Sequence, residues 1–185
     1  VVVAAMVADG IDVDRAAVLA EAAAGSLSRA RLLVDDPALH GRRNAWHSVP
    51  SRLDGSGAAV AVLVEELRAM IDDAQAPLVA RHEVELEALA EREEAFGTRG
   101  SGRRELVDRQ RREVRRLRDD ELRFGLATIS RVYRDTARAA SEAGQPVDSA
   151  MDATARITGA TGELVRNPNE TLLLQALLLD LPTAG

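Results

Sequence analysis

The chain has 185 residues, 46% of them hydrophobic, and its 24 basic and 30 acidic residues give a net charge of −6. It contains no cysteine, which excludes disulfides, thiolate zinc sites and cysteine nucleophiles. Every basic residue is arginine, so the lysine of a phosphate-binding loop, a Schiff-base lysine and a Ser-Lys pair are excluded as well.

The start of the chain predicts three short helices. A helix over residues 1–8 stops at Gly10, Asp12 or Asp14 caps a second helix, and Ser26 opens a third. Aromatic residues make up only 2% of the chain, so packing must rely on Leu, Val and Ala, a balance that favours helix. Three helices in so short a stretch predict a small bundle.

A fourth helix is expected from Asp36 to Pro50. His40 and His47 lie seven residues apart, nominally on one helix face, but two histidines without a third ligand make a weak case for a metal site. Ordinary half-exposed histidines are the favoured interpretation. Trp46, the only tryptophan, is expected to anchor the packing between two bundles.

A linker is expected at residues 51–57, SRLDGSG, because glycine and serine cluster there. Beyond it, apolar residues recur at helical spacing and predict an amphipathic helix. They are Val60, Leu63, Val64, Leu67 and Ile71. A break at Pro77 leads into a second helical stretch, residues 78–96, in which glutamates scatter around the helix. That scatter favours a solvated face over a metal or acid-base site.

An arginine-rich segment follows the connection at residues 97–102. Residues 99–118 hold 9 arginines and 3 acids. Two interpretations are open: contact with DNA phosphates or an acidic partner, and a solvated helix. The segment lacks aromatic residues that could stack on bases, and the net charge of the chain does not favour nucleic acid. The candidate contact residues are Arg103, Arg104, Arg111, Arg112, Arg115 and Arg116.

The last part of the chain predicts the end of this helix, near Gly144, and two more helices, the first capped by Asp148. In Arg166 to Pro182, RNPNETLLLQALLLDLP, Asn167 is the expected N-cap and Glu170 completes a capping box. This final helix is apolar on nearly every side and has to be buried, inside the chain or against a partner. The candidate partner-interface residues are Arg166, Asn167, Asn169, Glu170, Leu173, Leu174, Leu177 and Leu178.

No segment alternates convincingly with the period of a strand, so an all-α fold is expected. The sequence also lacks a nucleophile elbow, a zinc signature, a calcium loop and a glycine-rich nucleotide fingerprint. We therefore expect no catalytic site, no cofactor and no metal. No signal peptide or membrane-spanning run is visible, and the absence of cysteine fits a reducing cytoplasm.

Three stretches carry a family resemblance. RNPNE followed by LLLQALLL, SRVYRD at residues 130–135, and the run from Val1 to Arg31 resemble the C-terminal signature, a recurrent collar segment and the three-helix lid of one family. That family is the delta-prime subunits of bacterial DNA polymerase III clamp loaders, which are AAA+ proteins. The resemblance implies a lid bundle at 1–50, the linker at 51–57 and a helical collar at 58–185. It also implies a fragment, since a nucleotide-binding domain precedes the lid in this family.

The lid motif departs from that of the ATP-binding clamp-loader subunits. Theirs reads Gly-Ser-Leu-Arg, whereas here Gly25, Ser26 and Leu27 are followed by Ser28, with Arg29 one place later. A shift of one residue turns a side chain by about 100° around a helix. The stretch therefore resembles a lid that no longer senses nucleotide, as expected of a delta-prime subunit.

The resemblance implies a non-catalytic subunit that assembles the pentameric loader through its collar and supports ATP-driven loading of the sliding clamp onto primed DNA. Its partners would be the delta and the ATP-hydrolysing gamma/tau subunits, with the clamp and DNA reached through the whole complex and no membrane involved. Two alternatives are open: an arginine-rich helical DNA-binding module, and the lid and collar of the ATP-hydrolysing paralogue.

Overall fold

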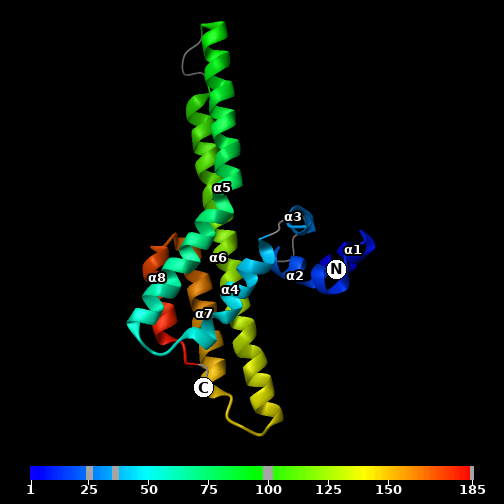
Figure 1. The fold of residues 1–185 in the computed structure, drawn as a ribbon, viewed down its shortest axis with the longest axis vertical. Helices are drawn as coiled ribbons and strands as arrows, with labels where there is room; N and C mark the ends of the chain where they lie inside the picture. Colours follow the sequence, from blue (N-terminus) through cyan, green and yellow to red (C-terminus); the bar gives the residue numbers. More distant parts are fainter. Residues whose placement is uncertain (24–26, 35–37, 98–101, 184–185) are drawn as a thin grey trace.

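The computed structural model describes residues 1–23, 27–34, 38–97 and 102–183. Over these ranges all regular elements are helical, which confirms the all-α prediction. The elements are α1 (Val2–Ala8), α2 (Val13–Ala22), α3 (Leu27–Leu32), α4 (Leu39–Arg52), α5 (Gly57–Phe96), α6 (Arg103–Glu142), α7 (Asp148–Glu163), the 3-10 turn η1 (Leu164–Arg166) and α8 (Glu170–Asp180). Figure 1 shows a helical body, a two-helix arm projecting from it and a small N-terminal cluster at its side.

The N-terminal cluster consists of α1, α2 and α3, which pack against one another (Figure 1). Asp12 caps α2, because its carboxylate accepts hydrogen bonds from the backbone N–H groups of Asp14 and Arg15. Through α2 the cluster also contacts α6, where the guanidinium of Arg131 lies 2.9 Å from the carboxylate of Glu21. The cluster is therefore attached to the body by α6.

Several predictions about this region fall outside the described residues. Gly25, Ser26 and Asp36 lie there, and so do the side chains of Ser28 and Arg29. The caps predicted for the third and fourth helices and the register of the lid motif therefore stay predictions.

The body of the molecule consists of α4, α7, α8 and the adjoining halves of α5 and α6 (Figure 1). Its core is mainly aliphatic, as the composition predicts, and Trp46 of α4 is fully buried in it against α6. The helix α4 packs on α5 and α6. α4 belongs mostly to the predicted lid, residues 1–50, but it packs on helices of the predicted collar, residues 58–185.

Two prolines predicted to end helices lie inside them instead. Pro50 lies within α4, which continues to Arg52, so the predicted linker at 51–57 shortens to residues 53–56. Pro77 lies within α5, where no break occurs. Pro77 is exposed, and the Asp73 carbonyl that loses its intrahelical partner can be solvated there. Figure 1 shows α5 changing direction about halfway along, as expected of a helix kinked by proline.

The arm is formed by residues 77–96 of α5 and 103–118 of α6, which run side by side in opposite directions (Figure 1). Its helices meet partly through polar contacts. The amide of Gln110 is buried and donates hydrogen bonds to the carbonyl of His82 and, at 3.1 Å, to the carboxylate of Glu85. Polar residues thus occupy some of the inward positions between the two arm helices.

Two helix starts differ from the prediction. Val147 occupies the N-cap position of α7, so Asp148 lies in the first turn and does not cap the helix. Asn167 adopts a left-handed backbone with φ 53° and ends the 3-10 turn. Asn169 caps α8 instead, accepting a hydrogen bond from the N–H of Leu172 over 3.1 Å. The predicted N-cap is therefore wrong by two residues, because asparagine also suits the left-handed turn before the helix.

Candidate protein interface

One side of the arm and the first turn of α8 form a groove of about 600 Å³. Its floor is apolar and comes from both arm helices, with Val79 and Leu86 of α5 facing Val107 and Val114 of α6. The members of each pair are seven residues apart, which places them on the same face of their helix. The apolar floor therefore extends over about two helical turns.

The edges of this groove contain residues of two predicted sites, the arginine-rich segment and the partner interface at the start of the final helix. Arg111 and Arg115 line its arm side, and Asn167 and Glu170 line its base. Arg111 has a side chain that is 78% exposed and lies 3.9 Å from the carboxylate of Asp108. The groove thus combines an apolar floor, an arginine edge and the RNPNE segment.

The other candidate arginines of α6 are exposed outside the groove. They are Arg103, Arg104, Arg112 and Arg116. Within the part of the chain that the structure describes, Arg115 and these four arginines take part in no hydrogen bond or ion pair. Their charges are therefore available to a partner.

Arg118 ties the base of the groove together. Its guanidinium, on α6, contacts Asp72 of α5 and Glu170 of α8, with Nε 2.7 and 2.6 Å from the two Glu170 carboxylate oxygens. Burial alone would lower the pKa of Arg118, but hydrogen bonds to Asp72 and Glu170 raise it above its usual value. Glu170, predicted for a capping box and a partner contact, is therefore used to join three helices within the chain.

A charged cluster fixes the register of the two arm helices. The Nε2 of His82 lies 2.9 Å from the Glu113 carboxylate, and Arg109 lies 2.7 Å from Glu85. A hydrogen bond from Gln110 lowers the pKa of Glu85, and a hydrogen bond with His82 lowers the pKa of Glu113, with nearby arginines adding to both shifts. Both carboxylates therefore favour their ionised forms in the folded arm.

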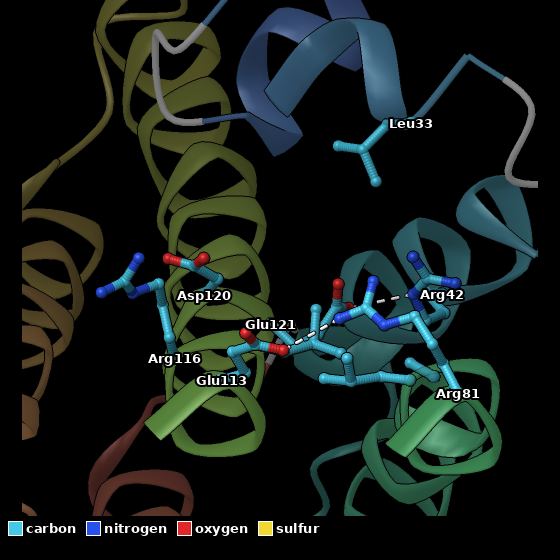
Figure 2. Close-up of a pocket in the computed structure, with 10 residues that line it drawn as sticks. Leu33, Arg42, Arg81, Glu113, Arg116, Asp120 and Glu121 are labelled. Carbon is cyan, nitrogen blue, oxygen red and sulfur yellow. Dashed lines mark hydrogen bonds and ion pairs between the residues drawn. The ribbon is translucent and has the colours of Figure 1, made fainter. Parts of the chain in front are cut away.

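A second cavity, of about 310 Å³, lies where the arm joins the body (Figure 2). Figure 2 shows Arg81 reaching to Glu113 and Arg42 to Glu121, and each pair is 2.9 Å apart. Leu33, from the segment after α3, lies above these pairs (Figure 2). Three arginines and three carboxylates line the cavity, so it presents no excess charge to a ligand, and we assign it a structural role.

The final helix, α8, buries one face and exposes the other. The buried face consists of Leu174, Leu177 and Leu178, with Leu173 half-buried beside it. Leu172 and Leu179, seven residues apart, are 64% and 53% exposed. The expectation that this helix is buried therefore holds for one face only. Three of the four predicted interface leucines lie in the chain's own core, and a partner would meet Leu172 and Leu179 first.

Local contacts account for most of the other predicted site residues. Arg166 is exposed and lies 2.6 Å from the carboxylate of Glu163, while Asn169 serves as the cap of α8. His40 and His47 are exposed on α4, and the described residues contain no group of three potential metal ligands.

Sequence reasoning assigned neither Leu172 and Leu179 nor the pair Val79 and Leu86 to a site. In a helix that is apolar all round, spacing alone does not tell which leucines face the core. The spacing of seven between Val79 and Leu86 is visible in the sequence, but their meeting with Val107 and Val114 depends on the arm's register.

One segment that carries the family resemblance, SRVYRD, reaches the residues just after α8. Tyr133, in SRVYRD, is buried, and its hydroxyl donates a hydrogen bond to the carbonyl oxygen of Pro182 over 2.8 Å. Burial raises the pKa of Tyr133 to about 12. This contact joins the second half of α6 to the end of the chain's last helix.

Replacing Tyr133 by phenylalanine should lower the free energy of unfolding by about 1 kcal/mol near neutral pH, because one buried hydrogen bond is lost. The folded-state pKa lies above the unfolded value of about 10. The hydroxyl's contribution is therefore complete below about pH 10 and is lost as the pH rises through 12. The chain has no lysine or cysteine and one tyrosine, so urea unfolding of both proteins at neutral and alkaline pH isolates this group. A difference that does not shrink above pH 10 would contradict the assignment.

Comparisons of this chain with protein-family models, with curated proteins and with solved structures return no match. None of the described helices combines the length and hydropathy needed to cross a lipid bilayer. The function is therefore inferred from the chain's own geometry and from its motif resemblance.

Proposed function

We propose that the chain is the lid and collar of a non-catalytic clamp-loader subunit of the delta-prime type. In this proposal the C-terminal bundle joins homologous collars of the delta and gamma/tau subunits, and the assembled loader uses ATP to place the sliding clamp on primed DNA in the cytoplasm. The observation that carries the proposal is the exposed apolar face of α8.

This face has the composition of a protein contact. Leu172, Ala176 and Leu179 follow one another at helical spacing and are all exposed, and Val165 in the preceding turn is 80% exposed. Contiguous exposed apolar residues on a helix commonly mark an interaction site. The opposite face is packed into the body, so the exposed leucines are held in place by a buried core.

The arrangement of the remaining helices supports a geometric role. The N-terminal cluster contacts the second half of α6 through α2, with Arg131 and Glu21 2.9 Å apart at this contact. The same half of α6 packs on α7, which in turn packs on α8. A rotation of the N-terminal cluster would be transmitted through α6 and α7 to α8, which carries the proposed assembly face.

Replacing Leu172 and Leu179 by glutamate should weaken binding to the collar fragments of the delta and gamma/tau subunits by at least about 100-fold, because each buried leucine contributes roughly 1.5 kcal/mol or more. Both side chains are exposed in the single chain, so the variant should keep its helical content and thermal midpoint. Size-exclusion chromatography with light scattering, on the mixed fragments, measures the complex.

The matched control replaces Val13 and Val84 by glutamate. These residues are 58% and 63% exposed and lie on α2 and on the arm, away from α8. The control changes net charge equally and should leave the complex intact. A chain that stays monomeric with every collar fragment, or that loses binding equally in both variants, would refute the assembly role.

A further inference from the structure

We propose that the groove between the arm and α8 is the docking site of an acidic amphipathic helix from a partner protein. This inference depends only on the groove's own chemistry and stands apart from the proposed clamp-loader role.

The floor of the groove specifies the apolar half of the partner. Val79 and Leu86 on α5 and Val107 and Val114 on α6 form an apolar strip along the floor of the groove. A third helix laid along this strip would place two apolar side chains, seven residues apart, over the floor. The apolar floor therefore takes about two turns of helix, and the arginine edge from Arg104 to Arg115 lengthens the contact to about three.

The edge of the groove specifies the charged half of the partner. Arg111 and Arg115 are one turn apart on its arm side, and Arg104 lies two turns before Arg111 on the same face of α6. Arg118 also lines the groove, but its guanidinium is already paired with the carboxylates of Asp72 and Glu170. Arg111 makes one long ion pair, 3.9 Å from Asp108, and remains 78% exposed. The positive charge open to a partner is thus concentrated toward the arm, and acidic residues of the partner would lie there.

Two other occupants fit less well. A DNA duplex would meet the arginines but gain nothing from an apolar floor. No Phe, Tyr or Trp lines the groove, and the one aromatic ring there, of His82, is buried and so cannot stack on unpaired bases. A second copy of this chain could offer the exposed Glu83, Glu87 and Glu91 of α5. The apolar residues Val79 and Leu86 of that same helix already form the groove, so its glutamate face lacks the apolar strip required.

The test is selection from a phage-displayed library of 16-residue peptides with random residues at the exposed positions of a helical template. The whole chain is the bait. We expect enriched peptides to carry acids beside apolar residues at spacings of three, four and seven. Binding of the enriched peptides, measured by fluorescence anisotropy, should weaken at least about tenfold in the Arg111→Glu, Arg115→Glu variant, since a reversed edge charge repels the acids.

Two matched controls separate the groove from general charge and general surface effects. The Arg112→Glu, Arg116→Glu variant makes the same charge change on the neighbouring strip of α6, and its peptide affinity should change less than about threefold. Val79→Glu should abolish binding, whereas Val84→Glu, on the other side of α5, should not. All six side chains are exposed, so the variants should fold.

Three outcomes would overturn the proposal. The first is no enrichment, or enrichment of peptides that bind the two arginine variants equally. The second is salt-dependent binding of a 20-base-pair duplex, lost in the Arg111→Glu, Arg115→Glu variant, without peptide enrichment, which would assign the face to DNA. The third is a concentration-dependent dimer that the same variant abolishes, which would assign it to a second copy of the chain.

Discussion

Replacing Gly125 by alanine should lower the free energy of unfolding by about 3 kcal/mol, because the added methyl group overpacks the core. Gly125 lies in the buried part of α6, and a Cβ atom at this position would overlap the carbons of the Trp46 indole. Trp46 is fully buried, so the ring has no free space into which to move. The substitution therefore forces α4 and α6 apart.

The control for this prediction is another helical glycine. Gly159 lies inside α7, and a Cβ atom there would meet nothing within 4 Å. Gly159→Ala should raise the free energy of unfolding by about 0.5–1 kcal/mol, since alanine loses less backbone entropy in a helix. Urea unfolding followed by far-ultraviolet circular dichroism compares the two variants. Equal stability of Gly125→Ala and the parent chain would mean that the indole does not lie against α6.

The contact between Trp46 and Gly125 also shows how far sequence reasoning reaches in this protein. A single tryptophan in an aliphatic chain predicts a packing anchor, but not its partner. The sequence does not indicate that Gly125 contacts an aromatic ring, because a glycine within a helical pattern normally indicates only a less stable helix. The need for glycine follows from the packing of α4 on α6, which brings the Trp46 indole against Gly125. That packing depends on contacts between residues 79 positions apart, such as Arg42 and Glu121.

Some predictions that depend on local chemistry succeeded, although the N-caps predicted at Asp148 and Asn167 did not. Asp12 caps α2 and the helix before Gly144 ends near it, because capping and left-handed glycine involve only neighbouring residues. The amphipathic pattern after residue 57 predicts the buried face of α5 from Val60 to Ile71, since one face of that helix packs on the body.

Predictions that depend on tertiary context failed. Pro77 does not break α5, because the carbonyl that loses its partner faces water and the helix continues into the arm, where it packs on α6. Glu170 does not close a capping box, because the N-cap is Asn169, and the Glu170 carboxylate binds Arg118 instead. At Glu170, an ion pair with a residue 52 positions away replaces a local capping contact worth about 1 kcal/mol.

The same reasoning about distant partners leads to the second large effect, at the buried pair of Arg42 and Glu121. Their side chains are 6% and 4% exposed and lie 2.9 Å apart (Figure 2). Glu121→Ala should lower the free energy of unfolding by about 3–5 kcal/mol, because it removes the carboxylate that balances a buried guanidinium. Urea unfolding of the whole chain measures this loss.

The exposed pair of Arg166 and Glu163 is the matched control. It is also an arginine-glutamate pair, 2.6 Å apart, but its side chains are 76% and 48% exposed. Glu163→Ala should change stability by less than about 0.5 kcal/mol, since water screens an exposed pair. A similar loss in Glu121→Ala and Glu163→Ala would mean that burial does not govern the contribution of the Arg42 pair.

A double substitution separates the need for charge balance from the need for an ion pair. Arg42→Met with Glu121→Leu removes both charges and keeps apolar volume between α4 and α6, so its stability should return to within about 1 kcal/mol of the parent chain or exceed it. Recovery would show that Arg42 and Glu121 fix how the two helices meet more than they stabilise the fold. Failure to recover would mean that the hydrogen bonds between Arg42 and Glu121, which join α4 to α6, contribute stability that apolar packing cannot replace.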